Sequence, residues 1–238
     1  MLQSTPTLSR NVHSQVSDWI GLSILRGDIR PGESLPSELQ ICEMMDVSRT
    51  VVREAIRTLN GKGLVESRAK SGTRVCPREQ WSQLDPDVMR WQMETKEFED
   101  YLAKLQQLRR AIEPQAAALA AVNASEEDMG RLRAGYEGMI AARDPESFAA
   151  ADASFHQSIY LATRNEFFWP IAQMFKVALR RAPSAARHGD EAADGLDAHR
   201  GVLNAIASRN AEEARVAAGA LLSRSAFSPA GQPAGAFA

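Results

Sequence analysis

The sequence predicts a mainly α-helical protein in which an N-terminal winged helix-turn-helix is followed by an all-helical bundle. Two observations indicate this fold class. Up to about residue 77, short segments alternate with turn signals such as Pro31-Gly32 and Ser71-Gly72. Beyond that point, alanine-rich stretches with helical periodicity run almost to the last residue. We therefore expect a small mixed unit first and a larger helical unit after it.

The stretch from Leu35 to Leu64 predicts two successive helices. Ser37 and Gln40 have the spacing of a capping box, so a short helix begins there and runs to about residue 45. Ser48 caps the next helix, whose apolar residues share one face: Val52, Ala55, Ile56 and Leu59. Three arginines repeat every four residues beside that face: Arg49, Arg53 and Arg57. A second helix with an apolar back and an arginine-lined front is what a DNA-reading helix requires.

Residues 63–75 predict a strand, a turn and a second strand. Three basic residues surround the tip of this hairpin: Arg68, Lys70 and Arg74. An arginine stripe by itself also suits a solvated helix face, but a basic wing beside it favours DNA binding. We expect the DNA-contacting residues to be Ser48, Arg49, Thr50, Arg53, Arg57, Lys70 and Gly72.

Beyond residue 97 the chain predicts about six helices and no strand. Ser125 before three acids, Asp144 before Pro145 and Asn210 three residues before a glutamate are helix-start signals. Further helical periodicity covers residues 98–121, 167–181 and 196–208. So many one-sided helices bury their apolar faces most simply in a bundle.

Asp152 and His156 stand four residues apart in one predicted helix, so their side chains project from one face. His199 opens another predicted helix. Two imidazoles and a carboxylate suit Zn²⁺, Ni²⁺ or Mn²⁺ and leave coordination positions open for a ligand. The spacing alone favours a coincidence on a surface or in a core over a metal site.

Arg109 lies in a predicted helix whose core side is marked by Leu105, Leu108, Ile112 and Leu119. An arginine near an apolar face must pair with a carboxylate or bind an acidic ligand in fork geometry. An internal ion pair with Glu113 or Asp152 and an effector-binding role therefore both stay open.

Composition limits the class of protein. Apolar residues make up 44% and charged residues 24% of the 238 residues, as in ordinary globular proteins. No apolar run approaches the roughly 20 residues that cross a bilayer, and the first twenty residues lack a secretory signal pattern. Cys42 and Cys76 have neither metal-site spacing nor a framework role. We therefore expect a cytoplasmic protein with no membrane partner.

Several stretches of the first 77 residues together resemble the GntR family of bacterial regulators. These are residues 27–39, Val47-Ser-Arg-Thr-Val-Val-Arg-Glu-Ala-Ile-Arg-Thr-Leu, Gly63-Leu-Val-Glu and Gly72-Thr-Arg-Val. The resemblance implies DNA contacts at Ser48, Arg49, Thr50 and Arg53, with Gly72 at the wing tip. One departure stands out: many members carry an arginine, also used on DNA, where this chain has Leu39.

The C-terminal part resembles the helical effector domain of the FadR branch of that family, known as the FCD domain. The matching text is Leu108-Arg-Arg-Ala-Ile-Glu-Pro114, Asp152-Ala-Ser-Phe-His156 and residues 198–206. The resemblance implies a metal held by an aspartate and three histidines. Here the third histidine is missing, since its expected position holds Leu221, and His188 lies in a polar stretch that nothing places in the site. A three-ligand site implies weaker metal binding, or a ligand held by direct hydrogen bonds.

The change of composition along the chain also predicts a division into domains. We expect a DNA-binding domain over residues 1–77, a linker over 78–96, a helical ligand-sensing domain over 97–227 and a disordered tail over 228–238. The stretch from Arg78 to Trp91 looks like the linker of sugar-acid-responsive members of the galactonate type, and we expect Trp81 and Trp91 to pack between the domains.

These features predict a transcriptional regulator that binds a palindromic double-stranded DNA operator as a homodimer. A small acidic metabolite, such as an aldonate, would control DNA binding from the C-terminal domain, and repression relieved by the metabolite is favoured over activation. A lactate-like carboxylate and an acyl thioester stay open as other effectors. The remaining alternative is a metal-dependent enzyme using Asp152, His156 and His199, but no motif for a nucleophile or general base accompanies them, so we do not expect an enzyme.

Overall fold

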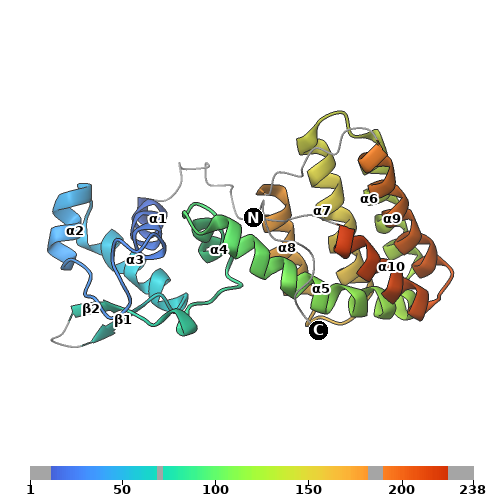
Figure 1. Ribbon diagram of the computed structural model, residues 1–238. Coiled ribbons are helices and arrows are strands. Elements are labelled where there is room, and N and C mark those ends of the chain that lie inside the picture. Colours follow the sequence, from blue (N-terminus) through green and yellow to red (C-terminus); the bar gives the residue numbers. More distant parts are fainter. Residues whose placement is uncertain (1–11, 69–71, 182–189, 225–238) are drawn as a thin grey trace, which may run out of the picture. The chain divides into compact units, whose positions relative to one another are not determined.

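The computed structural model describes residues 12–68, 72–181 and 190–224. The chain divides into two compact units, Met1–Lys96 and Glu97–Ala238 (Figure 1). Lys70, His188 and the expected tail over residues 228–238 lie outside the described residues. In the part of the chain that is described, no helix is both long enough and apolar enough to span a membrane.

The first unit is a winged helix-turn-helix. Its elements in chain order are α1 (Val12–Leu25), α2 (Glu38–Met45), α3 (Arg49–Gly61), β1 (Val65–Arg68), β2 (Gly72–Val75), the 3₁₀ helix η1 (Arg78–Gln80) and α4 (Pro86–Gln92). The predicted caps are confirmed, because the side chains of Ser37 and Ser48 accept hydrogen bonds from backbone N–H groups in the first turns of α2 and α3. β1 and β2 pair antiparallel, with Val65 opposite Val75.

The core of the first unit lies under α3. The predicted apolar face of α3 is buried, and it packs in one cluster with residues of α1 and the two strands, among them Val16, Ile20, Val65 and Val75. The turn between α2 and α3 passes through Asp46, whose φ of 51° is left-handed. The core therefore fixes α3 by its apolar back and leaves its other face to solvent.

The segment after the wing belongs to this same unit. Trp81 and Trp91 are 5% and 0% exposed and lie in the core cluster of the first unit. The expectation that both indoles pack between the domains is therefore wrong. Their rings are large enough to extend the small core over η1 and α4, so residues 78–92 form folded elements of the first unit.

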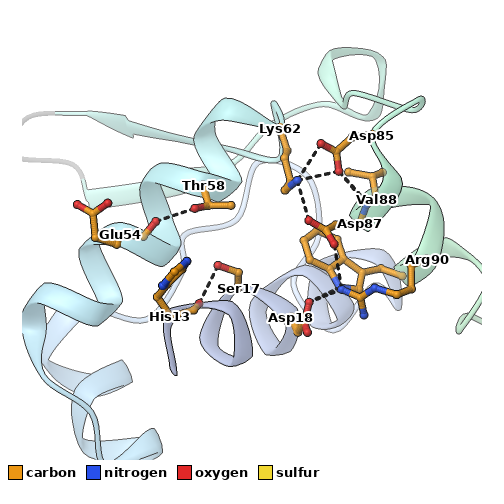
Figure 2. A network of polar contacts seen from close by, with 11 residues as sticks. His13, Ser17, Asp18, Glu54, Thr58, Lys62, Asp85, Asp87, Val88 and Arg90 are labelled. Atoms are coloured by element: carbon orange, nitrogen blue, oxygen red, sulfur yellow. Dashed lines mark hydrogen bonds and ion pairs between the residues drawn. The ribbon is translucent and has the colours of Figure 1, made fainter. Parts of the chain in front are cut away.

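Polar contacts hold α4 against the rest of the unit. Lys62, just after α3, lies 2.8 Å from Asp85 and 2.9 Å from Asp87 (Figure 2). Asp18 of α1 accepts hydrogen bonds from the Arg90 guanidinium and, at 3.0 Å, from the indole of Trp91. Glycine at position 21 leaves room for that indole, because a Cβ there would lie 2.6 Å from ring atoms of Trp91.

The second unit is all-helical in its described residues. Its helices are α5 (Phe98–Asn123), α6 (Glu126–Ala141), α7 (Pro145–Ala162), α8 (Trp169–Arg181), α9 (Asp190–Ala207) and α10 (Ala211–Arg224). The predicted capping residues Ser125 and Asp144 both form capping boxes. The helical bundle predicted from the sequence is confirmed.

The helices of the bundle pack against one another along their buried faces. α5 packs on α7, α9 and α10, while α6 packs on both α7 and α9 (Figure 1). Alanines form much of the buried side of α5: Ala116, Ala117, Ala120 and Ala121. Small side chains allow helix axes to come close, and this brings the polar residues of α5, α7 and α9 within reach of one another.

Candidate functional site

The exposed face of α3 carries the residues predicted to contact DNA. Ser48, Arg49, Thr50, Arg53 and Arg57 are all exposed. Gly72, at the start of β2, is also exposed and has a φ of +76°, a left-handed conformation that glycine adopts without strain. The basic and polar side chains of the first helical turns are therefore open to a partner.

Two of these arginines are held by acidic neighbours. Arg53 Nε lies 2.9 Å from Glu38 of α2, and Arg57 lies 3.2 Å from Glu54. Exposed pairs of this kind contribute only about 0–1 kcal/mol. A phosphate or a base edge could therefore replace either carboxylate at little cost.

Leu39 is the exposed neighbour of Glu38 on α2. Its side chain is 49% exposed, so the position where many relatives carry arginine is open to solvent here and has no charge.

A second cluster of functional side chains lies inside the helical bundle. Asp152 and His156 extend from α7 and His199 from α9, and one ligand atom from each lies within 4.8 Å of the others. Asp152 Oδ1 is 2.9 Å from His199 Nε2 and 3.5 Å from His156 Nε2. Both imidazoles are buried, whereas the aspartate side chain is 21% exposed. The structure thus brings the three predicted ligands together.

The chemistry of this donor set fits a divalent cation. His199 Nδ1 lies 2.7 Å from the Gly195 carbonyl, so it must donate its proton there. His156 Nδ1 is in close contact with the Glu113 carboxylate, which also requires a proton on that nitrogen. Both Nε2 atoms face Asp152, so once deprotonated they would direct lone pairs toward a cation bound there. Histidines that bind metals are held in this way, with the second ring nitrogen donating to an acceptor.

Arg109 and Glu113 of α5 form a buried ion pair next to this cluster. Arg109 Nε lies 3.2 Å from Glu113 Oε2, and both side chains are at most 4% exposed. The guanidinium also lies 5.8 Å from the ring centroid of Phe175. Among the described residues, no hydrogen-bond partner reaches Arg109 Nη2, although that atom is buried. The internal ion pair that the sequence left open is therefore present.

Glu113 has a central place that the sequence reasoning missed. Its Oε2 also accepts from the Tyr160 hydroxyl at 3.3 Å, and its Oε1 faces His156. Sequence reasoning treated Glu113 only as a possible partner of Arg109. The signal for Tyr160 was its position four residues after His156, which places it on the same face of α7.

The cluster also shifts the protonation of its members. Burial alone would raise the pKa of Glu113, but the charges of His156 and Arg109 outweigh it and lower the pKa to about 2. Burial likewise lowers the pKa of His156, yet the Glu113 and Asp152 carboxylates raise it to about 9. For Asp152, the two histidines overcome burial and hold the pKa well below its usual value. The site therefore contains two carboxylates that stay ionised and are stabilised by positive charge nearby.

Position 221 gives no further ligand. Leu221, where the resemblance placed a third histidine, is 3% exposed on α10 and carries no donor atom. Among the described residues, the candidate metal site thus has three protein ligands.

Comparison with known proteins agrees with this architecture. A family model described as bacterial regulatory proteins, gntR family, matches residues 13–75, and the FCD domain model matches residues 104–224. The galactonate operon transcriptional repressor of Escherichia coli K12 is 31% identical over 206 residues, which are 84% of this chain and 88% of that protein. The uncharacterized HTH-type transcriptional regulator YieP of the same organism is 31% identical over 216 residues, 90% of this chain and 93% of that protein.

Solved structures share the fold. Lar, which controls the expression of the Listeria monocytogenes agr system, gives a TM-score of 0.60 at 20% identity over 93% of this chain and 95% of that one. Streptococcus agalactiae GntR gives a TM-score of 0.51 at 23% identity over 89% of this chain and 97% of that one.

The family models and the two relatives at 31% identity place the chain in a family. The chain belongs to the GntR family of bacterial regulatory proteins, in the FadR-like branch with an FCD domain, and it is a DNA-binding transcriptional regulator rather than an enzyme.

Proposed function

We propose that this regulator is a cytoplasmic, homodimeric repressor that binds a palindromic operator and releases it when a small sugar acid of the aldonate type binds in the second unit. The observation that carries the proposal is the buried cluster of Arg109, Asp152, His156 and His199, in which Arg109 Nη2 has no partner among the described residues. The similarity to a galactonate operon repressor supports the same class of ligand.

On the DNA side, each residue has a distinct proposed role. Ser48, Arg49 and Thr50 stand at the N-terminal end of α3, where a recognition helix reaches base edges in the major groove. Arg53 and Arg57, further along, would meet phosphates, as would Lys70, and Gly72 would let the wing backbone approach the DNA. Two such units in a homodimer would read half-sites about one helical turn apart.

On the ligand side, Arg109 would receive the carboxylate of the acid. A guanidinium recognises a carboxylate through parallel N–H donors, and here Nη2 is a buried donor to which no described residue offers an acceptor. Asp152, His156 and His199 would hold a divalent cation such as Zn²⁺, Ni²⁺ or Mn²⁺. The cation would supply a Lewis-acidic contact for an oxygen of the ligand. Without the cation, the same three side chains could hydrogen-bond the hydroxyls of a polyol.

The polar character of the cluster favours a small hydrophilic acid over an acyl thioester. Two ionised carboxylates, a guanidinium and two imidazoles are costly to place beside a long alkyl chain, because charged groups lose favourable polar surroundings when they are buried against apolar ones. A lactate-like acid remains compatible with Arg109 but would use fewer of the donors and acceptors.

Ligand binding would act on DNA binding through differential affinity. A ligand shifts the protein toward a DNA-incompetent state only if it binds that state more tightly than the DNA-bound one. By reciprocity, operator DNA should weaken binding of the acid by the same factor.

The test is a thermal-unfolding screen of the full chain against hexonates, hexuronates, lactate and acyl thioesters, each with and without chelator. A ligand at about 100 times its Kd adds roughly 2.7 kcal/mol of stability, which gives a measurable rise in Tm. Arg109→Met should abolish the rise, whereas Arg131→Met, which removes an exposed arginine of α6, should not. A screen in which no acid raises the Tm would contradict the proposed ligand class.

A further inference from the structure

The Glu113 carboxylate contacts both Arg109, where we propose that the acid binds, and His156, one of the three proposed metal ligands. Its Oε2 accepts from Arg109 Nε at 3.2 Å and from the Tyr160 hydroxyl at 3.3 Å. Its Oε1 contacts His156 Nδ1, and the far nitrogen of that ring lies 3.5 Å from Asp152. A continuous chain of contacts therefore runs from Arg109 through Glu113 and His156 to Asp152.

Within the part of the chain that the structure describes, the charge of Glu113 is balanced by these neighbours. The Glu113 side chain is fully buried, so water does not screen its charge. Its electrostatic interactions with neighbouring charges are therefore stronger than they would be at the surface. While Arg109 is paired with Glu113, its positive charge offsets part of the negative charge that the carboxylate exerts on His156. When Arg109 binds an acidic ligand instead, more of the carboxylate's negative charge acts on His156. The imidazole then becomes a better electron-pair donor at Nε2.

We propose that Glu113 is a positioning residue that links the two halves of the site, so that an acidic ligand on Arg109 tightens divalent-cation binding at Asp152, His156 and His199. This inference rests on the proposed function, because it requires that the three side chains bind a cation. Linkage is reciprocal, so the cation would tighten binding of the acid by the same factor. The regulator would then respond to the acid only where the metal is also present.

The sign of the linkage follows from the charges. Removing the positive charge of Arg109 leaves the Glu113 carboxylate without that partner, so more of its negative charge acts on His156 and on a cation held at His156 Nε2. Removing the negative charge of Glu113 has the opposite effect. Two substitutions in the same ion pair should therefore change metal affinity in opposite directions, which a merely structural role of the pair would not produce.

The experiment is calorimetric titration of the full chain with Zn²⁺ alone, at one fixed pH. Glu113→Gln keeps the size of the side chain and should weaken Zn²⁺ binding about 10- to 100-fold, the usual cost of losing the group behind a ligating histidine. Arg109→Met should strengthen Zn²⁺ binding severalfold. In the double variant, the gain from Arg109→Met should largely disappear, because the carboxylate that transmits it is gone.

Controls separate this linkage from unfolding and from long-range charge effects. Glu127→Gln and Arg131→Met change an exposed pair of the same i, i+4 spacing on α6 and should leave Zn²⁺ affinity unchanged. Circular dichroism would show whether each variant folds. If Arg109→Met does not fold, Tyr160→Phe removes the other donor to Oε2 with little change of shape, and it should raise Zn²⁺ affinity in the same direction.

The outcomes distinguish the inference from the function on which it rests. If the unmutated chain binds Zn²⁺ but Glu113→Gln binds it equally well, or if the two single effects simply add, the linkage through Glu113 is overturned while the sensor proposal stands. If the unmutated chain binds no Zn²⁺, both the metal site and the linkage are overturned. In that case the ligand screen still decides whether the acid is bound without metal.

Discussion

The indole of Trp91 donates a hydrogen bond of 3.0 Å to Asp18, a residue 73 positions earlier in the chain. This contact joins α4 to α1 and makes residues after the wing part of the DNA-binding unit. The Arg90 guanidinium contacts the same carboxylate (Figure 2). α4 is therefore packed against α1 as part of the first unit and is not a loose connecting segment.

Gly21→Ala tests how tightly this packing is made. The added Cβ would lie 2.6 Å from the Trp91 ring, so the indole must move and its hydrogen bond to Asp18 must lengthen. Overpacking of this kind costs typically 1–3 kcal/mol, and we expect thermal unfolding of the first unit at a lower temperature. Gly61→Ala, where nothing lies within 4 Å of the new Cβ, is the control. Equal Tm values for both variants would show that the indole adjusts freely.

Arg49→Ala and Arg57→Ala should separate base reading from phosphate binding. If Arg49 contacts a base edge, its loss should weaken operator binding by about 1–3 kcal/mol and relax specificity at one position. If Arg57 contacts a phosphate, its loss should weaken binding to all sequences alike and lower the salt slope by about one. Fluorescence anisotropy on DNA selected from a random library by the unmutated chain would measure both. Arg133→Ala, exposed on α6 of the other unit, is the control, and identical salt slopes for both α3 variants would argue against the assigned roles.

Leu39→Arg tests the departure from the family pattern on α2. The side chain is exposed, so arginine fits without repacking, and we expect stable folding. A new phosphate contact should raise DNA affinity and steepen the dependence on salt by about one unit of slope. Leu39→Gln adds a polar side chain without charge and should leave the slope unchanged. An unaltered slope for the arginine variant would mean that position 39 does not face the DNA.

The buried cluster should make stability depend on pH when metal is removed with chelator. The Glu113 and Asp152 carboxylates raise the pKa of His156 from 6.5 to about 9, against the effect of burial. Protonated His156 therefore stabilises the fold fully below pH 6.5, and this stabilisation is lost as pH rises from 6.5 toward 9. Denaturant unfolding followed by circular dichroism across this range measures the loss.

His156→Gln is the variant that isolates this effect. It cannot take up a proton, so the fall in unfolding free energy between pH 6.5 and 9 should largely vanish. On the acid side the sign reverses. The lowered pKa of Glu113 stabilises the fold above its ordinary value of 4.5, and that contribution falls as pH drops toward about 2. A pH profile that is flat from 6.5 to 9 in the unmutated chain would contradict the assigned network.

Much of the fold follows from local signals in the sequence. Capping at Ser37, Ser48 and Ser125 depends on residues three apart, and these caps are formed as expected. The buried face of α3 and the shared face of Asp152 and His156 follow from helical periodicity alone. Such features could be predicted because each is decided within one or two turns of the chain.

The tertiary structure alone decided which distant residues meet. His199 joins Asp152 across 47 positions, and Glu113 reaches His156 across 43. Trp81 and Trp91 have the composition of a connecting segment around them, yet they fill the first unit's core. These placements depend on how whole helices pack and on which polar groups must be satisfied once buried. Spacing along the chain determined the candidate ligands, and only the packing of α5 against α7 and α9 decided that a guanidinium and its carboxylate would lie beside them.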